Sequence, residues 1–191
     1  SRGHRDDYDH WAAMGNKGWS YDEVLPYFLL SENNERIHDE FHGNNGPLSV
    51  CDLRTDNPVH ERYKKATEQA GFKWNNDFNG ADQEGIGLYQ VTQKDGQRCS
   101  AAQAYVLPFM AQRPNLTVEI KAQALKLEFD GKRAVAVEIL QNGKRRVIRA
   151  NKEIILAAGA FQTPQLLMLS GVGPATELQK HGIPVLKDLP G

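Results

Sequence analysis

The feature that most constrains this 191-residue chain is residues 159–173, which read Gly-Ala-Phe-Gln-Thr-Pro-Gln-Leu-Leu-Met-Leu-Ser-Gly-Val-Gly. The five residues before it, 154–158, are all apolar, as expected of a strand buried on both faces of a parallel sheet. Thr163 and Pro164 have the order of a helix N-cap and first helical residue, and Gly171 is placed to end that helix. The pattern therefore predicts a buried strand, a tight glycine turn and a short buried helix.

Antiparallel strands are predicted before this stretch. Alternating segments at residues 125–129, 134–140 and 145–149 are separated by Asp130-Gly131 and Asn142-Gly143. Asp-Gly and Asn-Gly between alternating segments are the strongest short-range hairpin signals. We expect a three-stranded antiparallel meander that leads into the buried strand, with another alternating segment, 116–120, ahead of it.

The first part of the chain predicts helices, short strands and turns. Helix starts are indicated by three pairs: Ser20 with Glu23, Asn57 with Pro58, and Ser100 with Gln103. Pro26 should kink the first of these helices, Gly71 should stop the second and Pro108 should limit the third. Short strands are expected at 48–50 and 88–92, whereas residues 3–19 show no clear period. The fold class predicted for the whole chain is mixed α/β.

Composition excludes several function classes. The 23 basic and 24 acidic residues nearly cancel, so there is no basic patch to recruit nucleic acid. No apolar run approaches the ~18–20 residues of a membrane span. Cys51 and Cys99 form no Cys-x-x-Cys pair, which favours a reducing, cytoplasmic setting, with peripheral attachment at the inner face of the membrane left open.

Two groups of residues invite a metal-site interpretation. Asp6, Asp7, Asp9 and His10 are crowded together, but adjacent residues on a helix or strand do not face one way. His38 and His42 have the spacing of helix-borne ligands, but the Gly-Asn-Asn-Gly-Pro that follows predicts a loop. We therefore predict no metal site.

The pattern Gly-Ala-x-x-Thr-Pro-x-Leu-Leu-x-x-Ser-Gly-Val-Gly resembles the second signature of the glucose–methanol–choline (GMC) family of FAD-dependent oxidoreductases. Further segments resemble family landmarks in family order, among them Arg2-Gly3, Gly18-Trp19-Ser20, Phe78-Asn79-Gly80 and Arg113-Pro114-Asn115-Leu116. Within the family, the chain is most similar to the choline dehydrogenases and the bacterial alcohol dehydrogenases close to them.

The resemblance implies that the chain is an internal fragment of a flavoprotein. Residues 1–112 would belong to a helical and β substrate cap with an FAD-covering segment, and residues 113–191 to part of the FAD-binding domain. The family's Gly-x-Gly-x-x-Gly and its catalytic His would lie upstream and downstream, so no catalytic residue is expected in the chain. Four residues match cofactor-binding positions: Ala124, beside the adenine edge, and Ala157, Ala158 and Gly159, beside the ADP half.

The resemblance also implies a reaction, in which a primary alcohol or choline-like substrate is oxidised to the aldehyde by hydride transfer to flavin. The electron acceptor stays open, and an O₂-using oxidase is one alternative. Another is a free-standing binding or interaction module with a relic flavoprotein core. By itself the chain is expected to be inactive and to bind FAD weakly or not at all. It is also expected to self-associate, because a sheet without its neighbour has an open edge.

Overall fold

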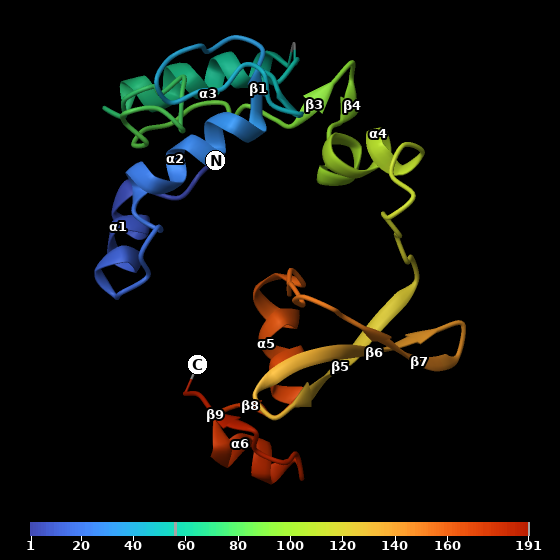
Figure 1. Cartoon of the computed structure of the whole chain (residues 1–191). Coiled ribbons are helices and arrows are strands. Elements are labelled where there is room, and N and C mark those ends of the chain that lie inside the picture. The colour runs from blue at the N-terminus through green and yellow to red at the C-terminus, as the bar shows by residue number, and fades with distance from the viewer. Residues whose placement is uncertain (56, 191) are drawn as a thin grey trace. The chain divides into compact units, whose positions relative to one another are not determined.

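The computed structural model describes residues 1–55 and 57–190. Contacts within the chain divide it into two compact units, Ser1–Leu116 and Thr117–Gly191 (Figure 1). Helices and small sheets occur in both units, which confirms the mixed α/β class. The functional division at 112/113 stays a prediction. None of the helices in the described residues is both long enough and apolar enough to cross a lipid bilayer.

Helices supply most of the regular secondary structure of the first unit. Its helices are α1 (Arg5–Ala13), α2 (Tyr21–Ser31), α3 (Pro58–Gln69), the π-helix η1 (Ala102–Val106) and α4 (Leu107–Met110). The predicted starts of α2 at Ser20 and of α3 at Asn57 are confirmed; in α3, Asn57 Oδ1 accepts a hydrogen bond from the N–H of Val59.

Helix α1 was not foreseen, because it contains no buried residue and so leaves no apolar period in the sequence. Its N-terminus is a capping box: the Asp6 N–H donates to His4 Nδ1, and the His4 N–H donates to Asp7 Oδ2. The prediction that Pro108 limits the third helix is wrong. Pro108 lies in the first turn of α4, where a missing N–H costs nothing, so the chain stays helical to Met110.

Short strands complete the first unit. Strand β1 (Glu32–Asn34) pairs in parallel with β2 (Leu48–Val50), and β3 (Gln93–Lys94) forms a hairpin with β4 (Gln97–Arg98). The predicted strand at 48–50 is confirmed, but the one at 88–92 is wrong. Within it only Val91 makes a bridge, to Cys51, and a single bridge does not make a ladder.

The loop between β1 and β2 presses its backbone against the end of α2 and the start of β1. A Cβ added to Gly43 would lie 1.9 Å from Leu29 O, and one added to Gly46 would lie 2.2 Å from the carbonyl carbon of Ser31. Gly46 also donates its N–H to Glu32 O at 2.8 Å. Only glycine allows this approach of two backbones.

The second unit begins with the predicted meander. Strands β5 (Ala122–Asp130), β6 (Arg133–Gln141) and β7 (Lys144–Arg149) form an antiparallel sheet in that order. Both turns lie where the sequence predicts them. The alternating segment 116–120 forms no strand, however, because Lys121 has a φ of +54°, which breaks the extended path before β5 begins.

The rest of the second unit consists of α5 (Gly159–Leu169), β8 (Val172–Gly173), α6 (Ala175–Lys180) and β9 (Lys187–Asp188). Helix α5 packs on β5, and Figure 1 shows it beside the sheet. The Ser170 hydroxyl accepts a hydrogen bond of 2.8 Å from the Leu127 N–H, which ties the end of α5 to β5. Leu127, Ala136, Ile139, Leu166 and Leu178 form the buried core.

Two predictions about residues 154–173 are wrong. Residues 154–158 form no strand, and Ile155 is 79% exposed, because no described segment pairs with them. Helix α5 starts at Gly159, five residues before Pro164, and only Leu166 in it is buried. Phe161 is 91% exposed, because no described element covers that face. Gly171 does follow the helix end, as predicted.

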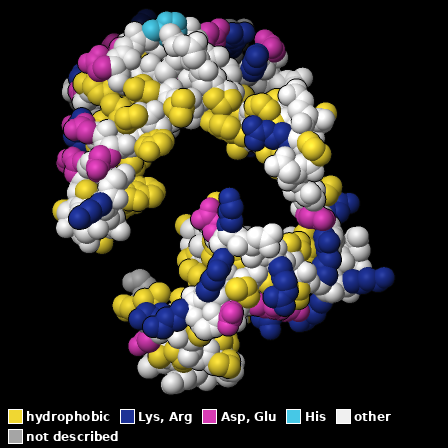
Figure 2. Space-filling model, in the orientation of Figure 1, with side chains coloured by type: hydrophobic (Ala, Val, Ile, Leu, Met, Phe, Trp, Pro, Cys, Tyr) yellow, Lys and Arg dark blue, Asp and Glu magenta, His cyan; other side chains and the backbone are white. Residues whose placement is uncertain are grey.

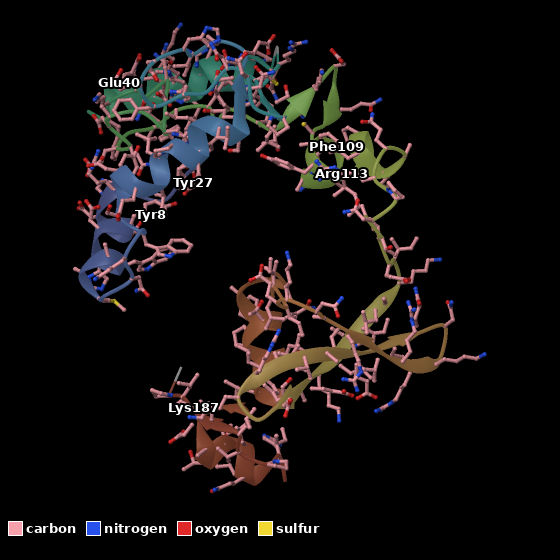
Figure 3. All side chains as sticks on the ribbon, in the orientation of Figure 1. Tyr8, Tyr27, Glu40, Phe109, Arg113 and Lys187 are labelled. Atoms are coloured by element: carbon pink, nitrogen blue, oxygen red, sulfur yellow. The ribbon has the colours of Figure 1, made fainter. Side chains whose placement is uncertain are left out.

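Apolar side chains are also exposed on the first unit. Figure 2 shows hydrophobic side chains gathered along α1 and α2, where Trp11, Trp19, Tyr27 and Leu30 are all exposed. Tyr8, labelled in Figure 3, packs between these helices against Tyr21 and Phe28. The contact between α1 and α2 is therefore aromatic, while large apolar side chains also lie exposed among the charged residues of their outer surfaces.

Candidate cofactor-facing site

The N-terminus of α5 is an open surface built from small residues. The predicted site residues Ala157, Ala158 and Gly159 are all exposed. Gly159 has a φ of +89°, and a Cβ placed on it would meet no atom within 4 Å. A positive φ is the reason that glycine suits this turn, and the free space beside it leaves room for another molecule.

No side chain among the described residues caps α5. Ala158 is the N-cap residue and has no side-chain hydrogen bond to offer, whereas the predicted cap, Thr163, lies inside the helix and accepts from the Ala158 N–H at 3.1 Å. The first backbone N–H groups of a helix lack partners within it, and they carry the positive end of the helix dipole. The start of α5 is therefore suited to a negatively charged group.

Ala124, the fourth predicted site residue, is exposed on β5. The register shifts between Ala124, opposite Ile139, and Lys126, opposite Glu138. One residue of β5 therefore bulges out of the ladder, which leaves backbone groups beside Ala124 without a partner in β6. Because β5 is an edge strand of its sheet, these groups can be approached from the side. All four predicted residues thus lie on β5 and at the start of α5, two elements that pack together.

A buried polar network in the first unit was not predicted. Arg2 Nη2 donates to Glu32 Oε2 at 2.7 Å, with both side chains less than a tenth exposed. Asn34 Nδ2 donates to Glu32 Oε1 and to Gln90 Oε1, at 3.1 and 2.8 Å. The network joins the start of the chain to β1 and to the segment before β3. In the sequence, the resemblance of Arg2-Gly3 to a family landmark was the one signal that pointed to this network.

The two histidines with helix-like spacing lie in a loop, as predicted, and they do not share partners. His38 Nε2 lies 3.0 Å from Asn34 O, whereas His42 Nδ1 lies 2.9 Å from Asp39 Oδ1. Burial would raise the pKa of Asp39, but hydrogen bonds from His42 and from the Phe41 N–H outweigh it and hold that pKa below its ordinary value. The crowded acids near His10 do not converge either: Asp6 and Asp7 are exposed, whereas Asp9 is half-buried and accepts a hydrogen bond from the Tyr21 N–H.

Comparison with known proteins gives the family. The model of the family described as GMC oxidoreductase matches residues 1–188. The chain belongs to the GMC family. Its resemblance to that family in sequence is thereby confirmed.

Curated GMC relatives cover the whole chain. It is 45% identical over 190 residues to the oxygen-dependent choline dehydrogenase of Brucella anthropi and 44% identical to the mitochondrial choline dehydrogenase of Homo sapiens. It spans 34% and 32% of the length of these two relatives, about a third in each case.

Solved GMC-type structures share the fold. The chain matches pyridoxine 4-oxidase from Mesorbium loti over 99% of its length, with a TM-score of 0.88 and 30% identity, and it covers 37% of that chain. The chain also matches an FAD-dependent oxidoreductase from Chaetomium thermophilum with a TM-score of 0.89 and 30% identity. This match covers 99% of this chain and 35% of that one.

The residues present fit the FAD on which GMC oxidoreductases depend. The open, positive-φ Gly159 leaves the space that a Cβ would fill, and the alanines before it add little bulk. The uncapped N-terminus of α5 supplies N–H donors for an anionic group, and the bulged edge of β5 supplies backbone groups for a base. Both features suit the ADP half of a dinucleotide.

Proposed function

We propose that this chain is the middle portion of an FAD-dependent oxidoreductase that oxidises a primary alcohol or choline-like substrate to the aldehyde. The observation that carries the proposal is the family match over residues 1–188, joined to the open, small-residue N-terminus of α5. The names of the relatives support the substrate class, since two of them are choline dehydrogenases.

Each part of the chain has a proposed role. Residues 1–112 form part of the substrate cap, and residues 113–191 form part of the FAD-binding domain. Ala124 pairs through its backbone with the adenine edge, and Ala157, Ala158 and Gly159 lie against the ADP half. Small side chains at these positions allow close approach of the nucleotide to the backbone.

The chain itself orients the cofactor without doing the chemistry. Bound FAD would supply the hydride acceptor of the reaction. The described residues contribute N–H donors at the start of α5 and backbone groups at the β5 bulge, which fix the position of the adenosine side. Because the chain spans about a third of its relatives, we place the group that accepts the hydroxyl proton outside it and assign no catalytic residue here.

The electron acceptor is O₂ or another oxidant. Among the similar proteins, one is named an oxygen-dependent choline dehydrogenase and another a pyridoxine 4-oxidase, so an O₂-using oxidase stays an alternative. We further propose a cytoplasmic location, because both cysteines are free, as in proteins of reducing compartments.

The proposal is tested by measuring flavin content and flavin reduction in the full-length protein. We expect a flavin absorbance band at about one flavin per chain, and reduction of that flavin by choline or a primary alcohol under anaerobic conditions. Turnover with O₂ against turnover with a dye acceptor then separates oxidase from dehydrogenase. Full-length protein that carries no flavin would contradict the proposal and favour the alternative of a free-standing binding module.

A further inference from the structure

The strongest unassigned feature is a cluster of three side chains in the first unit, remote in sequence from the cofactor-facing residues. Asp39 and His42 come from the loop between β1 and β2, which Glu40 marks in Figure 3, and Asp77 comes from the turn-rich segment after α3. One nitrogen or oxygen atom from each lies within 4.8 Å of the others. The His42 side chain is fully buried, at 0% exposure, while both carboxylates reach solvent.

Hydrogen bonding determines the form of His42. A carboxylate only accepts, so the Nδ1 atom that lies 2.9 Å from Asp39 Oδ1 must carry a proton and donate it. In a neutral imidazole the Nε2 atom then presents a lone pair. This buried Nε2 has no hydrogen-bond partner in the described residues, although Asp77 Oδ1 is 3.4 Å away. A lone pair that faces a carboxylate favours a cation between the two atoms. A second ring proton would draw them to about 2.7–3.2 Å, which is shorter than the 3.4 Å found here, so a metal ion fits this pair better than a proton does.

We propose that His42 Nε2 and Asp77 Oδ1 bind a divalent transition-metal ion, with Zn²⁺ as the best fit. Two ligands of a tetrahedral Zn²⁺, at about 2.0–2.2 Å from the metal, are separated by roughly 3.4 Å. The distance between these two atoms is 3.4 Å. Asp39 holds the imidazole from behind, as carboxylates behind metal-bound histidines do. Mg²⁺ and Ca²⁺ fit less well, because they prefer oxygen ligands alone.

Both carboxylates are already oriented for this role. Asp39 Oδ1 accepts from the Phe41 N–H, and Asp77 Oδ1 accepts from the Asn79 N–H, each at 2.9 Å. Gly80 lets the second oxygen of Asp77 lie close, since a Cβ there would be 2.4 Å from Asp77 Oδ2. The ion would enter between the carboxylates, complete its shell with water, and join the β1–β2 loop to the segment that follows α3.

Metal binding to the full-length protein tests the proposal. After chelation and removal of the chelator, the protein is titrated with Zn²⁺ by calorimetry, and metal per chain is counted by mass spectrometry. We expect about one bound Zn²⁺ that Asp77→Asn weakens at least tenfold. The control variant is Asp82→Asn, which removes a more exposed acid nearby, paired with Lys73. It should keep the wild-type affinity.

A second variant keeps the test valid if the first one does not fold. If Asp77→Asn does not fold, Asp39→Asn serves in its place, with an expected loss of about 10–100-fold in affinity, as for other carboxylates behind metal-bound histidines. The proposal is overturned if the wild type binds no Zn²⁺, or if the cluster variant binds it as tightly as Asp82→Asn does. Because metal content is read without turnover, the result does not depend on the proposed oxidoreductase activity.

Discussion

At the scale of single residues, the interior of the first unit depends on a buried charge. The Arg2 guanidinium donates to Glu32 and to the Phe41 carbonyl, and it lies 5.0 Å from the centre of the Phe28 ring. The pair is almost fully removed from water. A buried ion pair adds little net stability, but removal of one partner leaves the other charged and without compensation.

We therefore predict that Arg2→Met lowers the free energy of unfolding by about 3–5 kcal/mol, since Glu32 would stay buried without its cation. Urea unfolding followed by circular dichroism measures the change. The matched control, Arg54→Met, breaks an exposed pair with Glu35 and should cost about 1 kcal/mol or less. Equal losses in the two variants would contradict the assigned role of burial.

Gly159 allows a test of the cofactor-facing site. Gly159→Ala places a Cβ at a positive φ, which should cost roughly 1–2 kcal/mol of stability, and it narrows the surface proposed for FAD. Gly182→Ala is the control, because Gly182 also has a positive φ and open space but follows α6. In full-length protein we expect similar stability losses but reduced flavin per chain only for Gly159→Ala. An equal loss of bound flavin in the two variants would contradict the proposed contact between Gly159 and FAD.

At the scale of elements, helix ends show how local chemistry sets structure. At the start of α2, the N–H and the hydroxyl of Ser20 both donate to the Glu23 carboxylate, at 3.1 and 2.6 Å. The Ser20 hydroxyl, followed by its backbone N–H, holds the pKa of Glu23 below its ordinary value of 4.5. Glu23 therefore stabilises the fold above that ordinary value, and this contribution is lost as the pH falls through the lower, folded-state pKa.

We predict that Ser20→Ala raises the pKa of Glu23 toward 4.5. The free energy of unfolding should then fall less than in the wild type as the pH drops from 4.5 through the wild-type folded-state pKa of Glu23. Carboxyl-carbon NMR titration measures the shift. Ser100→Ala, which alters a hydrogen bond to the Gln103 N–H at another helix start, should leave Glu23 unchanged. An unchanged Glu23 pKa in Ser20→Ala would show that the hydroxyl is not its cause.

Local signals predicted the elements that depend on neighbours in sequence. The Asn57 cap, the Asn142-Gly143 turn and the meander around it are all present as predicted. Elements that depend on distant partners were predicted less well. The apolar segment 154–158 has no strand partner among the described residues, and α1, whose Tyr8 packs against Tyr21 and Phe28 of α2, buries no side chain fully. The carboxylate partners of His42 could not be predicted, because Asp77 approaches it only through the fold.

At the scale of the whole molecule, large apolar side chains are exposed in both units. Ile155 and Phe161 are largely exposed in the second unit, and large apolar side chains are exposed along α1 and α2 in the first. Such surfaces favour association. In the GMC relatives about two thirds of the sequence lies outside the part that matches this chain. Residues from that remaining part are available to pack against these apolar surfaces.

We predict that residues 1–191 expressed alone carry no stoichiometric flavin and self-associate, as judged by absorbance and by light scattering after size exclusion. Phe161→Lys should reduce the association, whereas Val59→Lys, at an exposed site on α3, should not. A monodisperse, flavin-loaded preparation of this piece would contradict both expectations.

The glycines of the β1–β2 loop have a consequence for the history and engineering of this chain. At Gly43 and Gly46 the obstacle to any side chain is main-chain carbonyl, which no compensating side-chain replacement elsewhere can move aside. A library that randomises these two positions should return glycine alone, even under weak selection for folding. Because the contact is made by backbone atoms alone, recombination between relatives should be tolerated even within this loop, provided that both glycines are kept.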